Sequence, residues 1–275
     1  MTRFGTWNVN SLKVRQERVE QWLVDVAPDI VCMQETKLAD SAFPQLAFQT
    51  LGYESAHHGE GRWNGVAVLS RAGLQDVSFG FADDAEPDTE ARLMTATCGG
   101  IKVVNVYVPN GRALDADHYQ YKLAWLDRLS RHLASVASPG DDVIIAGDFN
   151  IAPADADVYD PSKFTASTHT SAPERDRMGT LLDWGLIDVF RQHHPDAAKV
   201  FSWWDYRAGD FHEGRGMRID LVLASASVAD RAEWMIIDRN ARKGKLPSDH
   251  APVLMDLARS EDSAPRSGPG KAGLG

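Results

Sequence analysis

Short apolar runs of strand length alternate along this chain with longer amphipathic stretches, and this alternation limits the possible folds more than any other feature. Residues 142–146 (DVIIA) are continuously apolar after the first position, which is typical of a strand covered on both faces. Residues 19–26 and 114–134 carry apolar side chains at helical spacing, and Ser11 is a candidate N-cap for the first of these helices. Strands are expected at 3–9, 29–34, 65–69, 101–108, 142–146, 218–223 and 253–257. The pattern predicts a layered α/β fold with a buried sheet interior.

The 275 residues carry no internal repeat and no linker rich in Ser, Gly or Pro before position 258. A single folded domain over residues 1–258 is therefore expected, since α/β folds of about 250 residues often form one unit. The last stretch, 259–275, is rich in Ser, Gly and Pro and predicts a disordered tail.

The chain shows no sign of secretion or membrane insertion. It has only two cysteines, Cys32 and Cys98, without the spacing of a disulfide framework or a zinc site. The N-terminus lacks the apolar segment of a signal peptide, and no later stretch approaches about 18 apolar residues. We expect a cytoplasmic protein with reduced thiols.

Positive charge is local in a chain whose formal net charge is −10. An acidic total argues against non-specific binding of polyanions. However, Arg239, Arg242, Lys243 and Lys245 lie within seven residues, just before Ser248-Asp249-His250. This run is either a solvated loop or a clamp for backbone phosphates, which would make binding strongly salt-dependent.

Polar side chains gather at the predicted strand ends, where α/β folds usually build their sites. Glu35, Asp148, Asp220 and Asp249 are hard oxygen donors suited to Mg²⁺ or Mn²⁺, and His250 stands beside Asp249. Each could alone be a turn former or a capping residue, but their coincidence favours a site. Together with the amides of Asn8 and Asn150 and the phenol of Tyr107, they suit metal-assisted attack of water on a phosphodiester.

The sequence resembles the exonuclease III branch of the endonuclease/exonuclease/phosphatase superfamily, the class II abasic-site (AP) endonucleases. The resemblance covers about residues 2 to 257 and rests on motifs in the family's order: TWNVNS (6–11), MQETK (33–37), WNGVAVLSR (63–71), NVYVPNG (105–111), GDFN (147–150), FSWWDYR (201–207), RGMRIDLVLAS (215–225) and SDHAPV (248–253). It implies a four-layer α/β sandwich of the deoxyribonuclease I type, with two central β-sheets packed face to face and helices outside.

The resemblance also implies a metal site. Glu35 would be the principal ligand, with Asn8 and Asp249 nearby, and Asp148 and Asn150 would complete the surroundings of the Mg²⁺ or Mn²⁺ ion. Some relatives carry an acid where this chain has Asn10, which leaves a second metal position open.

The same resemblance assigns the chemical steps. Asp148 would activate or position the attacking water, and Asn150 would hold that water and the phosphate. His250, oriented by Asp220, would contact the scissile phosphate, while Tyr107 would contact the phosphate or assist the departing oxygen.

DNA contacts are expected around an apolar pocket that accepts a bare deoxyribose and excludes an intact base. The pocket residues implied by the family are Trp203, Met217 and Ile219, for which ordinary core packing is the alternative interpretation. Basic and amide side chains near the motifs would bind the DNA backbone; these are Arg218, Asn110, Arg112 and Arg92.

The leading hypothesis is a divalent-metal-dependent DNA repair phosphodiesterase that acts on double-stranded DNA as a monomer. It would incise 5′ to abasic sites and trim 3′ ends as an exonuclease or phosphatase, in a balance that the sequence leaves open. One alternative is a small-molecule phosphoesterase of the same superfamily, which the FSWWDYR and RGMRID segments argue against. Another is a DNA-binding scaffold without activity, although every expected side chain of the site is present.

Overall fold

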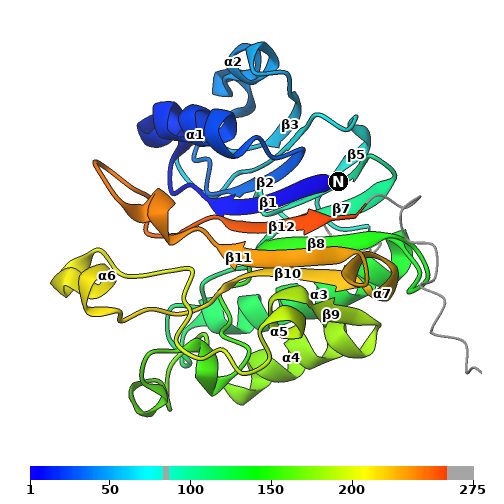
Figure 1. Ribbon diagram of the computed structural model, residues 1–275. Helices are drawn as coiled ribbons and strands as arrows, with labels where there is room; N and C mark the ends of the chain where they lie inside the picture. Colours follow the sequence, from blue (N-terminus) through cyan, green and yellow to red (C-terminus); the bar gives the residue numbers. More distant parts are fainter. Residues whose placement is uncertain (83–86, 259–275) are drawn as a thin grey trace, which may run out of the picture.

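The computed structural model, which describes residues 1–82 and 87–258, contains two six-stranded sheets packed face to face with helices outside (Figure 1). The first sheet has the order β11-β12-β1-β2-β4-β3: Ala232–Ile237, Val253–Leu257, Thr2–Asn8, Ile30–Gln34, Val66–Ser70 and Glu54–His58. The second has the order β5-β6-β7-β8-β10-β9: Gln75–Phe79, Leu93–Cys98, Ile101–Tyr107, Val143–Asp148, Asp220–Ser225 and Leu186–Asp188. The predicted four-layer sandwich is confirmed.

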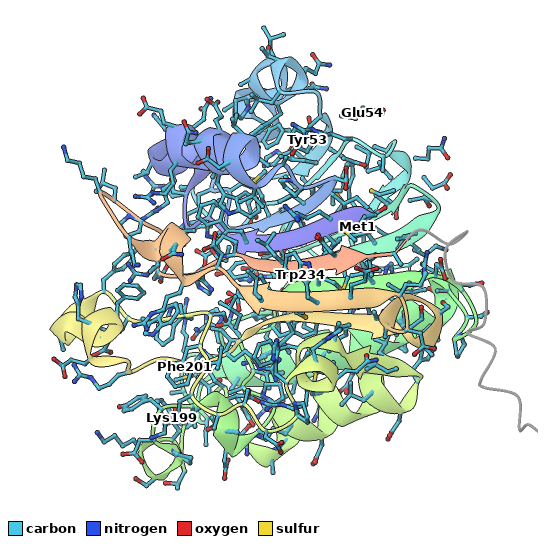
Figure 2. The ribbon with its side chains drawn as sticks, viewed as in Figure 1. Met1, Tyr53, Glu54, Lys199, Phe201 and Trp234 are labelled. Atoms are coloured by element: carbon cyan, nitrogen blue, oxygen red, sulfur yellow. The ribbon has the colours of Figure 1, made fainter. Side chains whose placement is uncertain are left out.

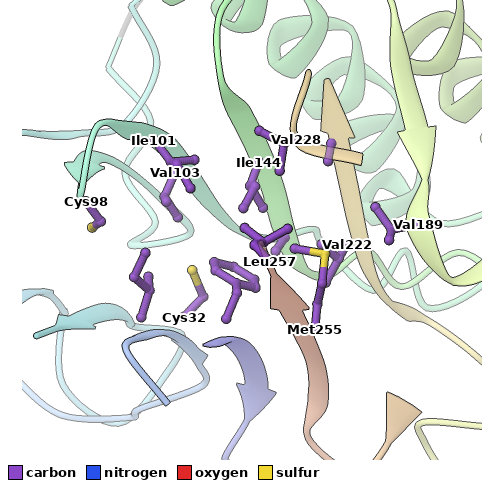
Figure 3. Close-up of a cluster of buried hydrophobic side chains, with 14 of the residues drawn as sticks. Cys32, Cys98, Ile101, Val103, Ile144, Val189, Val222, Val228, Met255 and Leu257 are labelled. Atoms are coloured by element: carbon purple, nitrogen blue, oxygen red, sulfur yellow. The ribbon is translucent and has the colours of Figure 1, made fainter. Parts of the chain in front are cut away.

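The space between the two sheets is filled by one face of each central strand. Successive side chains of a strand point to opposite faces, so residues two apart share a face. Even-numbered residues of several strands, such as Cys32, Ile144 and Val222, meet in this inner core, joined by Met255 (Figure 3). Cys32 and Cys98 are both buried, and neither forms a disulfide.

The odd-numbered faces of the same strands pack against helices. Helix α1 (Leu12–Val26) covers the first sheet through Val19 and Leu23. Helices α3 (Asp117–Val136) and α4 (Ala172–Asp183) cover the second sheet, with Leu126 and Leu129 over β8. The short helices are α2 (Gln45–Thr50), α5 (Val189–His193), α6 (Asp210–Glu213), α7 (Ala226–Ala229) and the 3₁₀ turns η1 (Asp40–Ala42), η2 (Asp155–Asp157), η3 (Pro161–Lys163), η4 (Arg207–Gly209) and η5 (Arg239–Arg242). Figure 2 shows side chains filling the layers between sheets and helices.

At one end of the sandwich the inner face becomes polar. Asn8 ends β1 and Asp148 ends β8, and both continue the even-numbered inner face. Asp220 begins β10 directly opposite Asp148 in the antiparallel register. The segments that carry α6 and η5 project from this side of the molecule (Figure 1).

The expected strands and the two long helices are all present, with shifts of one or two residues at most strand ends. Ser11 occupies the N-cap position of α1, but its side chain makes no capping hydrogen bond. Strands β3, β5, β6, β9 and β11 were not predicted; β5 is exposed along its whole length and so lacks an apolar run. The expected tail at 259–275 lies outside the described residues. None of the helices in the described part of the chain has the length and hydropathy of a membrane span.

Candidate active site

Two carboxylates from different sheets are held together by one amide. Glu35 follows β2 in the first sheet, and Asp148 ends β8 in the second. The Nδ2 atom of Asn8 donates to Glu35 Oε1 at 2.8 Å and to Asp148 Oδ2 at 2.9 Å. The polar end of the inner core is therefore a junction in which both sheets contribute acids to one point.

His250 lies on the other side of Asp148. Its Nδ1 atom is 2.8 Å from Asp220 Oδ2, and its Nε2 atom is 3.8 Å from Asp148 Oδ2. The Ser202 hydroxyl accepts from the backbone N–H of Asp220 at 3.0 Å and fixes the start of β10. All three ionisable side chains are buried, with Asp148 and Asp220 at 1% and His250 at 3% exposure.

Burial and charge act in opposite directions on the imidazole. Burial lowers the pKa of His250, but the carboxylates of Asp220, Asp148 and Asp249 outweigh it and raise that pKa to about 10. Burial raises the pKa of Asp148 to about 7, against the opposing charge of His250. His250 is therefore an imidazolium at neutral pH, and a divalent cation beside Asp148 would favour its carboxylate form.

The oxygen donors at this junction fit a divalent metal ion. Ligating atoms of Glu35, Asp148 and His250 all lie within 4.8 Å of one another. Because the His250 nitrogen that faces Asp148 carries a proton, the two carboxylates are the donors that suit a cation. Oxygen donors without thiolate are what Mg²⁺ and Mn²⁺ prefer.

Asp249 is tied to its neighbours by two side-chain donors. Its Oδ1 atom accepts from Asn10 Nδ2 at 2.9 Å, and its Oδ2 atom accepts from the Trp203 indole at 3.1 Å. Lys37 Nζ donates to the side-chain carbonyl oxygen of Asn10 at 2.6 Å. The metal contacts predicted for Asn8, Asn150 and Asp249 stay predictions.

Asn150 follows β8 in a left-handed backbone conformation, with φ of 49°. Its backbone N–H donates to Asp148 Oδ1 at 2.9 Å, and its Nδ2 atom donates to the carbonyl of Val108 at 2.9 Å. Tyr107 lies at the end of β7, where burial and the charge of Glu35 raise the pKa of its phenol above the ordinary value. The phenol is therefore a proton donor at neutral pH.

The residues predicted to form a sugar pocket belong to one apolar cluster near His250, and their contact with a sugar stays a prediction. Met217 and Ile219 are buried together with Val158, and Trp203 packs on them with its ring partly exposed. Backbone bridges join Trp203 to both Met217 and His250. The structure therefore brings Trp203, Met217 and Ile219 to the same place as the carboxylates.

Arg218 is a correction to the predicted DNA contacts. Its side chain is 1% exposed, and its guanidinium binds Asp157 at 2.7 Å and Asp188 at 2.8 Å. It lies on the opposite face from Met217 and Ile219 because neighbours in an extended segment alternate. Asp157 is itself 1% exposed and also binds Arg191.

The basic run before Ser248 also contains both buried and exposed side chains. Arg242 is 6% exposed; its guanidinium lies over the rings of Tyr206 and Phe211, so its predicted role in a phosphate clamp is wrong. Lys243 and Lys245 are exposed on the loop beside it.

The remaining predicted DNA contacts line a groove of about 410 Å³ beside Tyr107. Asn110 and Arg112 are exposed there, whereas Arg92 is 9% exposed, pairs with Glu90 at 2.6 Å and lies over the Tyr107 ring. Trp63, in the predicted WNG motif but without an assigned role, is 66% exposed in the same groove.

His169 was missed by the sequence analysis. Its Nε2 atom lies 3.2 Å from Asn150 Oδ1 and 3.1 Å from Asn110 Nδ2, in a segment without helix or strand. Burial, followed by the charge of Lys122, lowers the pKa of His169 to about 4. No periodic pattern surrounds this residue, so nothing in the sequence marked it.

Comparison with known proteins assigns this chain to a family. Residues 5–250 match the family sequence profile described as "Endonuclease/Exonuclease/phosphatase family". The chain belongs to this family.

The exodeoxyribonuclease III of Haemophilus influenzae is 33% identical to this chain, and the matched region covers 93% of this chain and 99% of the Haemophilus protein. A structure of the 3′ phosphatase NExo from Neisseria, bound to a product DNA hairpin, is 40% identical with a TM-score of 0.89, covering 94% of this chain and 100% of that one. An AP endonuclease from Archaeoglobus fulgidus is 38% identical with a TM-score of 0.90, covering 94% and 99%. The predicted family and fold are confirmed, and the protein is a nuclease-type phosphoester hydrolase.

Proposed function

We propose that this protein is a Mg²⁺-dependent DNA repair phosphodiesterase that acts as a monomer on duplex DNA at abasic sites and 3′ termini. The observation that carries the proposal is the position of the His250–Asp220 pair between the Glu35–Asp148 carboxylates and the Trp203–Met217–Ile219 pocket. Groups suited to phosphate chemistry thus lie beside an apolar cluster whose Trp203 ring is partly exposed. The names of the relatives, a 3′ phosphatase, an exodeoxyribonuclease and an AP endonuclease, support the same class of substrate.

Glu35 and Asp148 would hold the cation, which when bound supplies Lewis-acid stabilisation of the phosphate and lowers the pKa of a nearby water. Asp148 then takes the proton of the attacking water as this water forms a bond to phosphorus. Asn150, whose amide is fixed by Val108 and by His169, orients the water and a phosphate oxygen.

The charge that builds up on the phosphoryl oxygens meets the His250 imidazolium, whose other nitrogen is fixed by Asp220. The bond between phosphorus and the 3′ oxygen of the upstream nucleotide breaks, and the Tyr107 phenol would donate a proton to the departing oxygen. The products are a 3′-hydroxyl and a 5′-phosphate, which at an abasic site belongs to the deoxyribose.

The proposal is tested on four duplex or single-stranded oligonucleotides with matched sequence. One carries an abasic analogue, one a recessed 3′ end, one a 3′-phosphate, and one is single-stranded. We expect cleavage of the first three with Mg²⁺, none with chelator, and little turnover of the single strand.

Asp148→Asn is the matched variant, because it removes the base and retains the shape. It should lose about 10²–10⁴-fold in rate while its affinity for duplex changes little. Hydrolysis of inositol phosphates or lipids in preference to all DNA substrates would contradict the proposal. Full activity of Asp148→Asn would contradict the assigned role.

A further inference from the structure

A fully buried ion pair lies beneath the phosphate-binding side of the site. Lys122 on α3 and Glu174 on α4 are both 0% exposed, and Lys122 Nζ is 2.5 Å from a Glu174 carboxylate oxygen. Burial lowers the pKa of Lys122, an effect that the Glu174 charge partly offsets. Burying two charges is costly, and hydrophobic residues of the same volume often do as well or better for stability.

The ammonium of Lys122 donates to the loops of the site. It lies 2.6 Å from the backbone carbonyl of Asn150 and 3.3 Å from that of Asn110. These two residues follow β8 and β7, and their side chains meet, with Asn110 Nδ2 3.2 Å from Asn150 Oδ1. One buried cation therefore fixes the backbone of both asparagines.

Glu174 fixes a third segment, the one that carries Thr168 and His169. Its Oε1 atom accepts from the backbone N–H of His169 at 2.9 Å and from the Thr168 hydroxyl at 2.7 Å. His169 in turn contacts the Asn150 side chain. The segments that carry Asn110, Asn150 and His169 are thus all bonded to the ion pair.

The turn after Asn110 is shaped to the Lys122 side chain. Gly111 has a φ of +88°, and a Cβ built on it would lie 3.1 Å from Lys122 Cδ and 2.7 Å from the Thr168 hydroxyl oxygen. Only a glycine allows this loop to close down on the lysine stem.

We propose that Lys122 is a positioning residue for catalysis, with Glu174 as the counter-charge that holds it, and that the pair sets the Asn150 amide against the phosphate. The inference rests on the proposed role of Asn150. A purely structural role, docking α3 on α4, would not need these bonds, because the same two helices are also joined at the surface by Arg177 and Asp127 at 2.9 Å.

The test is Lys122→Met with Glu174→Gln, which removes both charges together and retains an acceptor toward His169. We measure kcat and KM on a 3′-phosphate duplex and on an abasic duplex, the duplex Kd, and the melting temperature. The proposal predicts a kcat at least tenfold lower, with KM and Kd within about twofold, because Lys122 cannot touch DNA. A kcat within twofold of the parent in the folded double variant overturns it.

Two controls separate the possible failures. Arg177→Gln breaks the surface pair between the same helices and should leave kcat unchanged; an equal loss of kcat in this variant means that Lys122 only docks the helices. Asn150→Ala should abolish turnover; if it does not, the proposed role of Asn150 fails rather than the positioning by Lys122. If the double variant does not fold, Glu174→Gln alone decides, with a several-fold lower kcat expected and a parental kcat overturning the proposal.

Discussion

His250 and Asp220 reach each other across the two sheets: His250 precedes β12 in the first, Asp220 begins β10 in the second, and their side chains meet at 2.8 Å. The contact fixes one ring nitrogen and leaves the other facing Asp148. It therefore joins the two halves of the sandwich at the point where the phosphate would bind.

Asp220→Asn is predicted to lower kcat by about 10²–10⁴-fold, because an uncharged amide no longer stabilises the imidazolium. The alkaline limb of the pH–rate profile should move to lower pH, since the pKa of His250 would fall. Duplex affinity should hold within about twofold. Steady-state kinetics between pH 6 and 10 check this, and an unmoved alkaline limb would show that Asp220 does not control the charge of His250.

The raised pKa of His250 also predicts how stability depends on pH. The group has a folded pKa of about 10 against an ordinary value of 6.5, so its contribution to stability is fully present below pH 6.5 and is lost as the pH rises through about 10. The urea midpoint of the metal-free protein should fall between pH 8 and 10. In His250→Gln the urea midpoint should fall less over the same pH range. If the midpoint fell equally in the two proteins, the claim that His250 is charged in the folded protein would be refuted.

Arg218 is predicted to act on stability and not on DNA affinity. Replacing it with Met removes the ion-pair partner of the Asp188 carboxylate and of the buried Asp157 carboxylate. This should lower the free energy of unfolding by about 3–5 kcal/mol. Urea unfolding measures the loss, and duplex titration should give a Kd within about twofold of the parent at a temperature where the variant is folded. A weakened Kd without a stability loss would restore the DNA contact that the fold argues against.

Lys243 and Lys245 are predicted to show the opposite behaviour. Both are exposed on the loop before Ser248, so Lys243→Gln with Lys245→Gln should weaken duplex binding and leave unfolding unchanged. Removing one lysine–phosphate interaction should reduce the slope of log Kobs against log salt by about 0.9. Titrations at several salt concentrations measure this slope, and an unchanged slope would place DNA elsewhere.

Strand periodicity predicted a layered α/β fold with polar side chains at the strand ends, whereas the four-layer sandwich and the roles of the site residues were implied by the family resemblance. Asn8, Asp148 and Asp220 replace apolar residues at the polar end of the same inner face that Ile144 and Val222 occupy. Once the strands are located, the convergence of these side chains follows from the topology.

What the sequence analysis missed depends on contacts between loops. Arg218 and Asp157 pair across 61 positions, and no local pattern distinguishes a buried arginine from a DNA-binding one. Likewise His169 reaches Asn150 from an irregular segment that Glu174 and Lys122 hold in place. Such partners are set by tertiary packing alone.

The most direct test of the site is the Mg²⁺ dependence of cleavage in Glu35→Gln. If Glu35 and Asp148 bind one catalytic cation, this variant should need far more Mg²⁺ for half-maximal rate. At saturating Mg²⁺ it should turn over a 3′-phosphate duplex at least 10²-fold more slowly, while its melting temperature stays that of the parent protein. A parental rate and half-saturating Mg²⁺ concentration in the folded variant would contradict the account.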